Sequence, residues 1–183
     1  LTVGGIEPRK NSINLLNAFH AVRQQQPPAQ LVIAGGATLF DYRAYRQAFI
    51  KQVEAYKLAD SLILPGVVPD ADLPGLYRLA DVFVFPSVQE GWGLVLLEAI
   101  ASGLPVLTSN QAPFTEFLSE REAMLVDPGD VGAIATAMVT LLNPDIAQRL
   151  VTHGQSIISR YNWQHSAQMH LALYTRLIKS PTN

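Results

Sequence analysis

The sequence lacks cysteine, long apolar runs and clusters of basic residues, and each absence excludes a class of protein. With no cysteine among its 183 residues, the chain forms no disulfide scaffold, no zinc ribbon and no cysteine nucleophile. No apolar stretch approaches the roughly 20 residues of a membrane-spanning helix. The N-terminus also shows no basic, then apolar, then small-residue signal pattern. We therefore expect neither a transmembrane segment nor a targeting signal.

Charged residues are few and form no run of one sign. They make up 15% of the chain, and the formal net charge is −2. Residues 1–60 carry seven Lys and Arg against four Asp and Glu, whereas residues 61–140 carry two against ten. A surface that binds duplex nucleic acid would cluster its basic residues. We therefore expect no nucleic-acid partner, while the mildly basic first third leaves room for one or two phosphates.

Short apolar, β-branched runs alternate with longer segments of helical spacing. With 49% apolar residues, the chain can bury the core of one globular domain. Residues 1–4 read as the end of a strand whose beginning is missing, so we expect a fragment of a longer protein. The predicted strands are nearly continuous in apolar residues, as parallel strands covered on both faces are. They span residues 1–4, 31–35, 62–66, 82–86, 105–109 and 124–127.

Helical spacing separates the strands and continues after the last of them, at about 130–142, 145–160 and 163–178. Because strands and helices alternate along the chain, the predicted class is α/β. We expect a doubly wound, mostly parallel six-stranded Rossmann-like sheet with helices on both faces and C-terminal helices. In such a sheet a ligand binds at the carboxyl ends of the strands.

The stretch from Pro86 to Gly103 runs from a strand end through a glycine loop into a helix. Gly91 and Gly93 let the backbone come close to a ligand. The helix start presents unpaired N–H groups and the positive end of the helix dipole, which favour phosphate. The helix is apolar nearly all round, so we expect Glu98 to be a hydrogen-bonded carboxylate in a mostly buried element.

Glu90 precedes Glu98 by eight positions, a span of ~12 Å on an ideal helix. A hexose at Glu90, a diphosphate on the intervening amides and a ribose at Glu98 fit this span, because carboxylates accept hydrogen bonds from hydroxyls. An ordinary strand, loop and helix with two structurally paired carboxylates explains the same residues. The pattern alone leaves both interpretations open.

The block EGWGLVLLEAIASGLPVLTS, which contains both glutamates, closely resembles the signature of the group 1 retaining glycosyltransferases, enzymes of the two-domain GT-B fold. The similarity continues through VGGIEPRKNSINLLNAF, LVIAGG, LILPGVVPDADLPGLYRLADVFVFPS, MLVDPGD and YNWQHSAQMHLALY. These blocks cover essentially the whole chain, in the order of that family's C-terminal domain. The resemblance therefore implies a donor-binding domain.

The resemblance also implies roles for individual residues. Glu90 would contact the donor sugar, and Glu98 would bind the ribose of the nucleotide. Gly66 and Val67 align with the backbone that holds the nucleobase. The turn between the glutamates would hold sugar and phosphate through Gly91, Trp92, Gly93 and Leu94.

Two cations are assigned to the diphosphate. Lys10 matches the family lysine that neutralises it, and it follows the first strand at the start of a helix that we expect Asn11 or Ser12 to cap. Many members carry an arginine where this chain has Gly5. Arg9 would supply the missing guanidinium, whose planar fork suits phosphate.

These features predict the donor half of an enzyme that transfers a hexose from a nucleoside diphosphate sugar to a glycan, lipid or small-molecule acceptor with retention. Residues 1–160 would form the nucleotide-sugar-binding domain and residues 161–183 a trailing helix. The family's N-terminal acceptor domain is absent, so the isolated fragment should bind nucleotide but show little or no turnover. Two alternatives are a non-catalytic nucleotide-sugar-binding module, which Gly5 favours, and a sugar-nucleotide epimerase of the same fold, which the EGWG block argues against.

We expect no cofactor and no metal site, because the four histidines show no metal-ligand spacing. The expected partners are the nucleotide sugar and the protein's own N-terminal domain. Any peripheral contact with a membrane would be made through that missing domain. The expected location is the cytoplasm.

Overall fold

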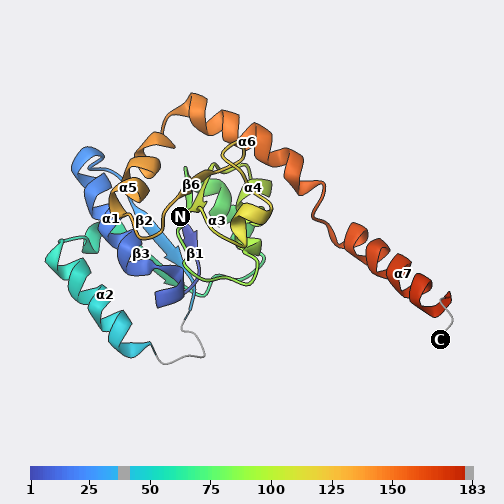
Figure 1. The fold of residues 1–183 in the computed structure, drawn as a ribbon. Coiled ribbons are helices and arrows are strands. Elements are labelled where there is room, and N and C mark those ends of the chain that lie inside the picture. Colours follow the sequence, from blue (N-terminus) through green and yellow to red (C-terminus); the bar gives the residue numbers. More distant parts are fainter. Residues whose placement is uncertain (37–41, 180–183) are drawn as a thin grey trace.

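The computed structural model describes residues 1–36 and 42–179, and it shows parallel strands flanked by helices (Figure 1). One sheet has the order β1-β2-β3, formed by Thr2–Val3, Leu31–Ala34 and Leu62–Gly66. The other has the order β4-β5-β6, formed by Phe83–Phe85, Val106–Ser109 and Met124–Val126. All pairings are parallel, and every strand lies within its predicted range.

The two sheets adjoin along β1 and β4. The Val84 amide donates to the Leu1 carbonyl at 2.8 Å, while on the other side of β1 the Gly4 amide donates to the Ala34 carbonyl at 2.7 Å. The six strands therefore lie in the order β3-β2-β1-β4-β5-β6. The order reverses between β1 and β4, which is the switch point where open α/β sheets bind their ligands. The predicted fold class is confirmed.

Helices cover both faces of the strands (Figure 1). On one face α1 (Ser12–Gln25) packs against α2 (Arg43–Ala55) and α5 (Val131–Thr140). On the other, α4 (Leu94–Ala101) packs against α3 (Leu73–Leu79) and α6 (Pro144–Ile158). Alternate side chains of β4 enter the two cores, with Val84 in one and Phe83 and Phe85 in the other. This period-2 alternation is why the buried strand is apolar throughout.

The last helix, α7 (Trp163–Lys179), extends away from the rest of the chain (Figure 1) and has no buried residue. Asn162 caps its start, since the Asn162 side chain accepts from the His165 amide at 2.8 Å. Its exposed apolar side chains include Leu171, Tyr174 and Ile178. Within residues 1–36 and 42–179, no helix combines the length and apolarity that crossing a bilayer requires.

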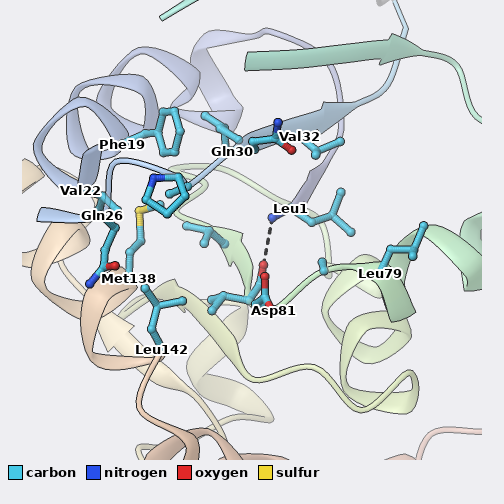
Figure 2. Close-up of a pocket in the computed structure, with 16 residues that line it drawn as sticks. Leu1, Phe19, Val22, Gln26, Gln30, Val32, Leu79, Asp81, Met138 and Leu142 are labelled. Carbon is cyan, nitrogen blue, oxygen red and sulfur yellow. Dashed lines mark hydrogen bonds between the residues drawn. The ribbon is translucent and has the colours of Figure 1, made fainter. Parts of the chain in front are cut away.

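A cavity of about 470 Å³ opens at the amino ends of β2 and β4 (Figure 2). Its lining includes Phe19, Met138 and Leu142. The Leu1 nitrogen, which lies among these residues, donates to the Val82 carbonyl at 2.9 Å. Because ligands of such sheets bind at the opposite, carboxyl ends, this cavity is separate from the candidate site.

Candidate functional site

Two loops meet at the carboxyl ends of β1 and β4. The loop after β1 ends in a 3-10 turn, Pro8–Lys10, and the loop after β4 begins at Pro86. The Ser87 hydroxyl and the Val88 amide both donate to the Arg9 carbonyl, at 2.6 and 2.9 Å. These bonds hold residues some 80 positions apart in the sequence as one surface at the switch point.

Four charged side chains interact on this surface. The Glu90 Oε1 atom lies 2.5 Å from Lys10 Nζ and 3.0 Å from Arg9 Nη1, and it also accepts from the Ser87 hydroxyl at 3.1 Å. The Arg9 Nε atom donates to Glu7 Oε2 at 2.7 Å. Two carboxylates thus balance two cations, and an incoming anion would compete with Glu90 for both of them.

Lys10 is the more buried of the two cations. Its side chain is 13% exposed, and its Nζ atom lies 4.5 Å from the centroid of the Phe85 ring. A Cβ atom on Gly4 would come within 3.1 Å of Lys10 Cε, so the lysine stem lies against bare backbone. Burial lowers the pKa of Lys10, and the hydrogen bond and charge of Glu90 oppose that shift. An additional anion would stabilise the protonated amine further.

The start of α1 differs from the sequence-based expectation. Asn11 occupies the N-cap position with φ 59°, but its side chain does not cap the helix. Its Nδ2 atom instead donates to the Pro128 carbonyl at 2.6 Å, and the Ser12 hydroxyl bonds to the Glu7 backbone. The side-chain cap was therefore wrongly predicted, because the left-handed turn at Asn11 directs its amide toward the loop after β6.

The glycine turn leads into α4 as predicted. Gly93 has φ 97°, a conformation that favours glycine, and a Cβ there would come within 2.9 Å of the Phe114 ring. Gly91 meets no such restriction. Since α4 begins at Leu94 without a side-chain cap, the first amides of the helix are available to an anion.

The Trp92 ring packs within the protein. It stacks on Phe117 with ring centroids 4.8 Å apart and contacts Tyr161 at 5.6 Å. This packing fixes the turn and leaves the backbone of Trp92, rather than its indole, as the part that can face a ligand.

Glu98 is exposed, which corrects the expectation of a mostly buried helix. α4 buries Leu96, Ala99 and Ile100, whereas Leu94 is 56% exposed on the same face as Glu98. The apolar composition of α4 suggested burial on all sides, but the helix packs against the sheet with one face only. The carboxylate is hydrogen-bonded, as expected, but its partner is a protein group.

That partner is the Tyr77 hydroxyl on α3, which donates to Glu98 Oε2 at 2.7 Å. Tyr77 is only 2% exposed, and burial together with the Glu98 carboxylate raises its pKa. The phenol therefore stays protonated and orients one carboxylate oxygen of Glu98, while the residue remains open to solvent.

Glycines at the ends of β1, β2 and β3 bring their backbones together beside the charged cluster. The Gly35 amide donates to the Gly66 carbonyl at 2.9 Å, and a Cβ on Gly35 would lie 2.9 Å from the Gly5 nitrogen. A Cβ on Gly36 would come within 2.5 Å of Val67, which is itself 78% exposed. Gly5, Gly66 and Val67 thus lie along the same sheet edge.

The structure adds three residues to the predicted set: Glu7, Tyr77 and Ser87. Ser87 lies two residues after the end of β4, and Tyr77 places a polar hydroxyl on an apolar helix face, so the sequence carried a signal for both. Nothing in the sequence pattern distinguishes Glu7. Among residues 1–36 and 42–179, no group of three His, Asp or Glu side chains is arranged to hold a metal ion.

An open parallel sheet with paired cations and carboxylates at its switch point defines the class of the chain, a Rossmann-like α/β domain. The chain belongs to the family of glycosyl transferases group 1, whose model matches residues 1–156. It is 31% identical to the O-antigen chain mannosyltransferase B of Escherichia coli over 97% of this chain and 45% of that protein.

Solved structures show the same fold. The C-terminal domain of a glycosyl transferase group 1 family protein from Francisella tularensis matches with a TM-score of 0.77 and 23% identity, over 87% of this chain and 83% of that one. Anabaena Alr3699/HepE, solved in complex with UDP and glucose, matches with a TM-score of 0.83 and 23% identity, over 94% of this chain and 48% of that one. The chain thus spans less than half the length of the mannosyltransferase and of the Anabaena protein.

Proposed function

We propose that this chain is the donor half of an enzyme that transfers a hexose from a nucleoside diphosphate sugar to an acceptor hydroxyl with retention of configuration. Family membership supports glycosyl transfer, and the mannosyltransferase similarity makes mannose donors the first to test. The observation that carries the proposal is the Lys10, Arg9 and Glu90 cluster at the switch point, beside the start of α4.

Each part of the cluster has a role in this reaction. Lys10, Arg9 and the first amides of α4 would stabilise the diphosphate as its bond to the anomeric carbon breaks. Glu90, released from the two cations, would accept hydrogen bonds from the sugar, and Glu98 from the ribose. The acceptor oxygen forms the new bond to the anomeric carbon, and its proton is released. These roles require no cofactor and no metal ion from the protein.

The acceptor side lies outside this chain in the proposal. We infer that a further domain of the protein completes the cleft, since the relatives are longer. The 183-residue chain should then bind nucleotide without turnover.

The test is calorimetric titration of the chain with UDP-, GDP- and ADP-sugars, followed by transfer assays on the full-length protein with product configuration read by NMR. Binding without transfer by the full-length protein would favour a non-catalytic module. An altered sugar nucleotide formed without acceptor would identify an epimerase.

Replacing Glu98 tests the ribose assignment. We expect Glu98→Ala to weaken nucleoside diphosphate binding roughly 10- to 100-fold, because two hydroxyls lose a charged acceptor. The variant should also bind ribose and 2′,3′-dideoxyribose diphosphates equally, whereas the wild type should prefer the ribose form. Glu54→Ala, at an exposed position on α2, is the matched control. A variant that still prefers ribose would refute the assignment.

Tyr77→Phe tests whether Glu98 must be oriented. Loss of the 2.7 Å hydrogen bond should weaken nucleoside diphosphate binding by roughly 3- to 10-fold and reduce the preference for ribose, since one hydrogen bond contributes about 1 kcal/mol. Tyr56→Phe removes a hydroxyl that bonds to Gln52 and Asn17 away from the site. We expect the control to bind as the wild type does, and equal affinities for the two variants would contradict the orienting role.

A further inference from the structure

Glu7 is a buried carboxylate that forms an ion pair with Arg9, one of the two cations of the site. Its side chain is 2% exposed, and its Oε2 atom accepts from Arg9 Nε at 2.7 Å. Its backbone is fixed on both sides of the residue: its amide donates to the Ser12 hydroxyl at 3.3 Å, and its carbonyl accepts from the Lys10 amide at 3.2 Å. A buried carboxylate on a rigid backbone is a fixed anchor for whatever cation pairs with it.

Arg9 is bound by two carboxylates through different nitrogens. Glu7 accepts a hydrogen bond from Nε, whereas Glu90 accepts one from Nη1 at 3.0 Å. The guanidinium has five N–H donors in one plane, so a partner at Nε sets the orientation of both Nη groups. The Arg9 side chain is 36% exposed, so the guanidinium is partly accessible even though Glu7 is not.

The two carboxylates are not equivalent when an anion arrives. Glu90 also accepts from the Ser87 hydroxyl at 3.1 Å, so it keeps a partner when an anion displaces it from the two cations. Glu7 contacts Arg9 at the nitrogen that the anion does not need. A phosphate can therefore bind the Nη groups while the hydrogen bond from Nε to Glu7 persists. The guanidinium of Arg9 then keeps its orientation.

Resting on the proposed function, we propose that Glu7 is a positioning residue that holds Arg9 by its Nε atom and presents the Nη groups to the donor diphosphate. Arg9 then binds the diphosphate in place of the arginine that many family members carry where this chain has Gly5. Glu7 acts only through Arg9 and does not touch the substrate.

The test is a double-mutant cycle with Glu7→Gln, Arg9→Met and the double variant, titrated with a nucleoside diphosphate and the matching monophosphate. Glu7→Gln should weaken diphosphate binding about 10-fold and monophosphate binding much less. In the Arg9→Met background it should have no further effect. Glu54→Gln is the control for loss of an exposed carboxylate, and thermal unfolding checks that each variant folds.

The outcomes separate this inference from the proposed function. If the wild type binds no nucleoside diphosphate, the proposed function fails and this inference fails with it. If Arg9→Met weakens binding but Glu7→Gln does not, or if the two effects add, only the positioning role is overturned.

A measurement on the wild type covers the case in which Glu7→Gln does not fold. The Arg9 Nε–H resonance, assigned by its absence in Arg9→Met, should exchange slowly with water and remain so at saturating diphosphate, while the Nη signals shift. Release of Nε–H to rapid exchange on binding would overturn the proposal.

Discussion

Lys10→Ala is expected to weaken nucleoside diphosphate binding roughly 100- to 1,000-fold, the largest loss of affinity of any single substitution proposed for this site. Lys10 is largely buried, contacts Glu90 directly and lies over the Phe85 ring. Its removal takes one of two cations from a partly desolvated site. Of the two cations that contact Glu90, Arg9 then remains. Calorimetric titration of the chain with a nucleoside diphosphate measures the effect.

Two further variants make the result specific. Lys51→Ala removes an exposed lysine of α2 and should bind as the wild type does. Lys10→Arg keeps the charge but should not restore affinity, because the lysine stem passes within 3.1 Å of a Cβ position on Gly4 and the planar guanidinium is broader. Wild-type affinity in Lys10→Ala would show that the diphosphate binds elsewhere.

Gly35→Ala is expected to lower the free energy of unfolding by about 3 kcal/mol. The added Cβ would lie 2.4 Å from both the carbonyl carbon and the oxygen of Gly4, and strand backbone paired in a sheet cannot move aside as a side chain can. The clash would separate the ends of β1 and β2 and displace the loop that carries Lys10. Urea denaturation measures the loss.

Gly75→Ala is the matched substitution with the opposite expectation. Gly75 lies within α3, and a Cβ there meets no atom within 4 Å. Because alanine is the better helix former, this variant should be as stable as the wild type or more stable, by up to about 1 kcal/mol. A Gly35→Ala variant as stable as Gly75→Ala would mean that the two strand ends separate without cost.

The fold could be predicted from the sequence because its signals are local. Each strand is a short apolar run, and the crossovers that join β1 to β5 have helical spacing, so neither requires knowledge of distant contacts. The connection from β5 to β6 contains only the 3-10 turn Phe114–Glu116. The last three helices follow the same rule, and α5, α6 and α7 begin within one residue of their predicted starts. Buried parallel strands leave a clear pattern because both faces are covered.

The site could be predicted only in part, because its geometry depends on side chains from distant loops. The glycine turn and both glutamates follow from one contiguous stretch. The partners of those glutamates do not: Tyr77 reaches Glu98 from another helix, and Arg9 and Lys10 reach Glu90 across 80 positions. Asn11 failed as a predicted cap because its amide bonds to the Pro128 carbonyl, a contact that local sequence cannot reveal.

The seam between β1 and β4 has a consequence for how the domain assembles. Leu1 pairs with Val84, so the chain must complete three strands and their crossovers before the seam can close. Closing a contact over so long a stretch is entropically costly and slow. A half-assembled domain would carry Arg9 and Lys10 without Glu90, and it would have no α4 to receive an anion. In the proposed function, the nucleotide would therefore bind only the fully assembled state, and it would stabilise the domain against global unfolding rather than against local fraying.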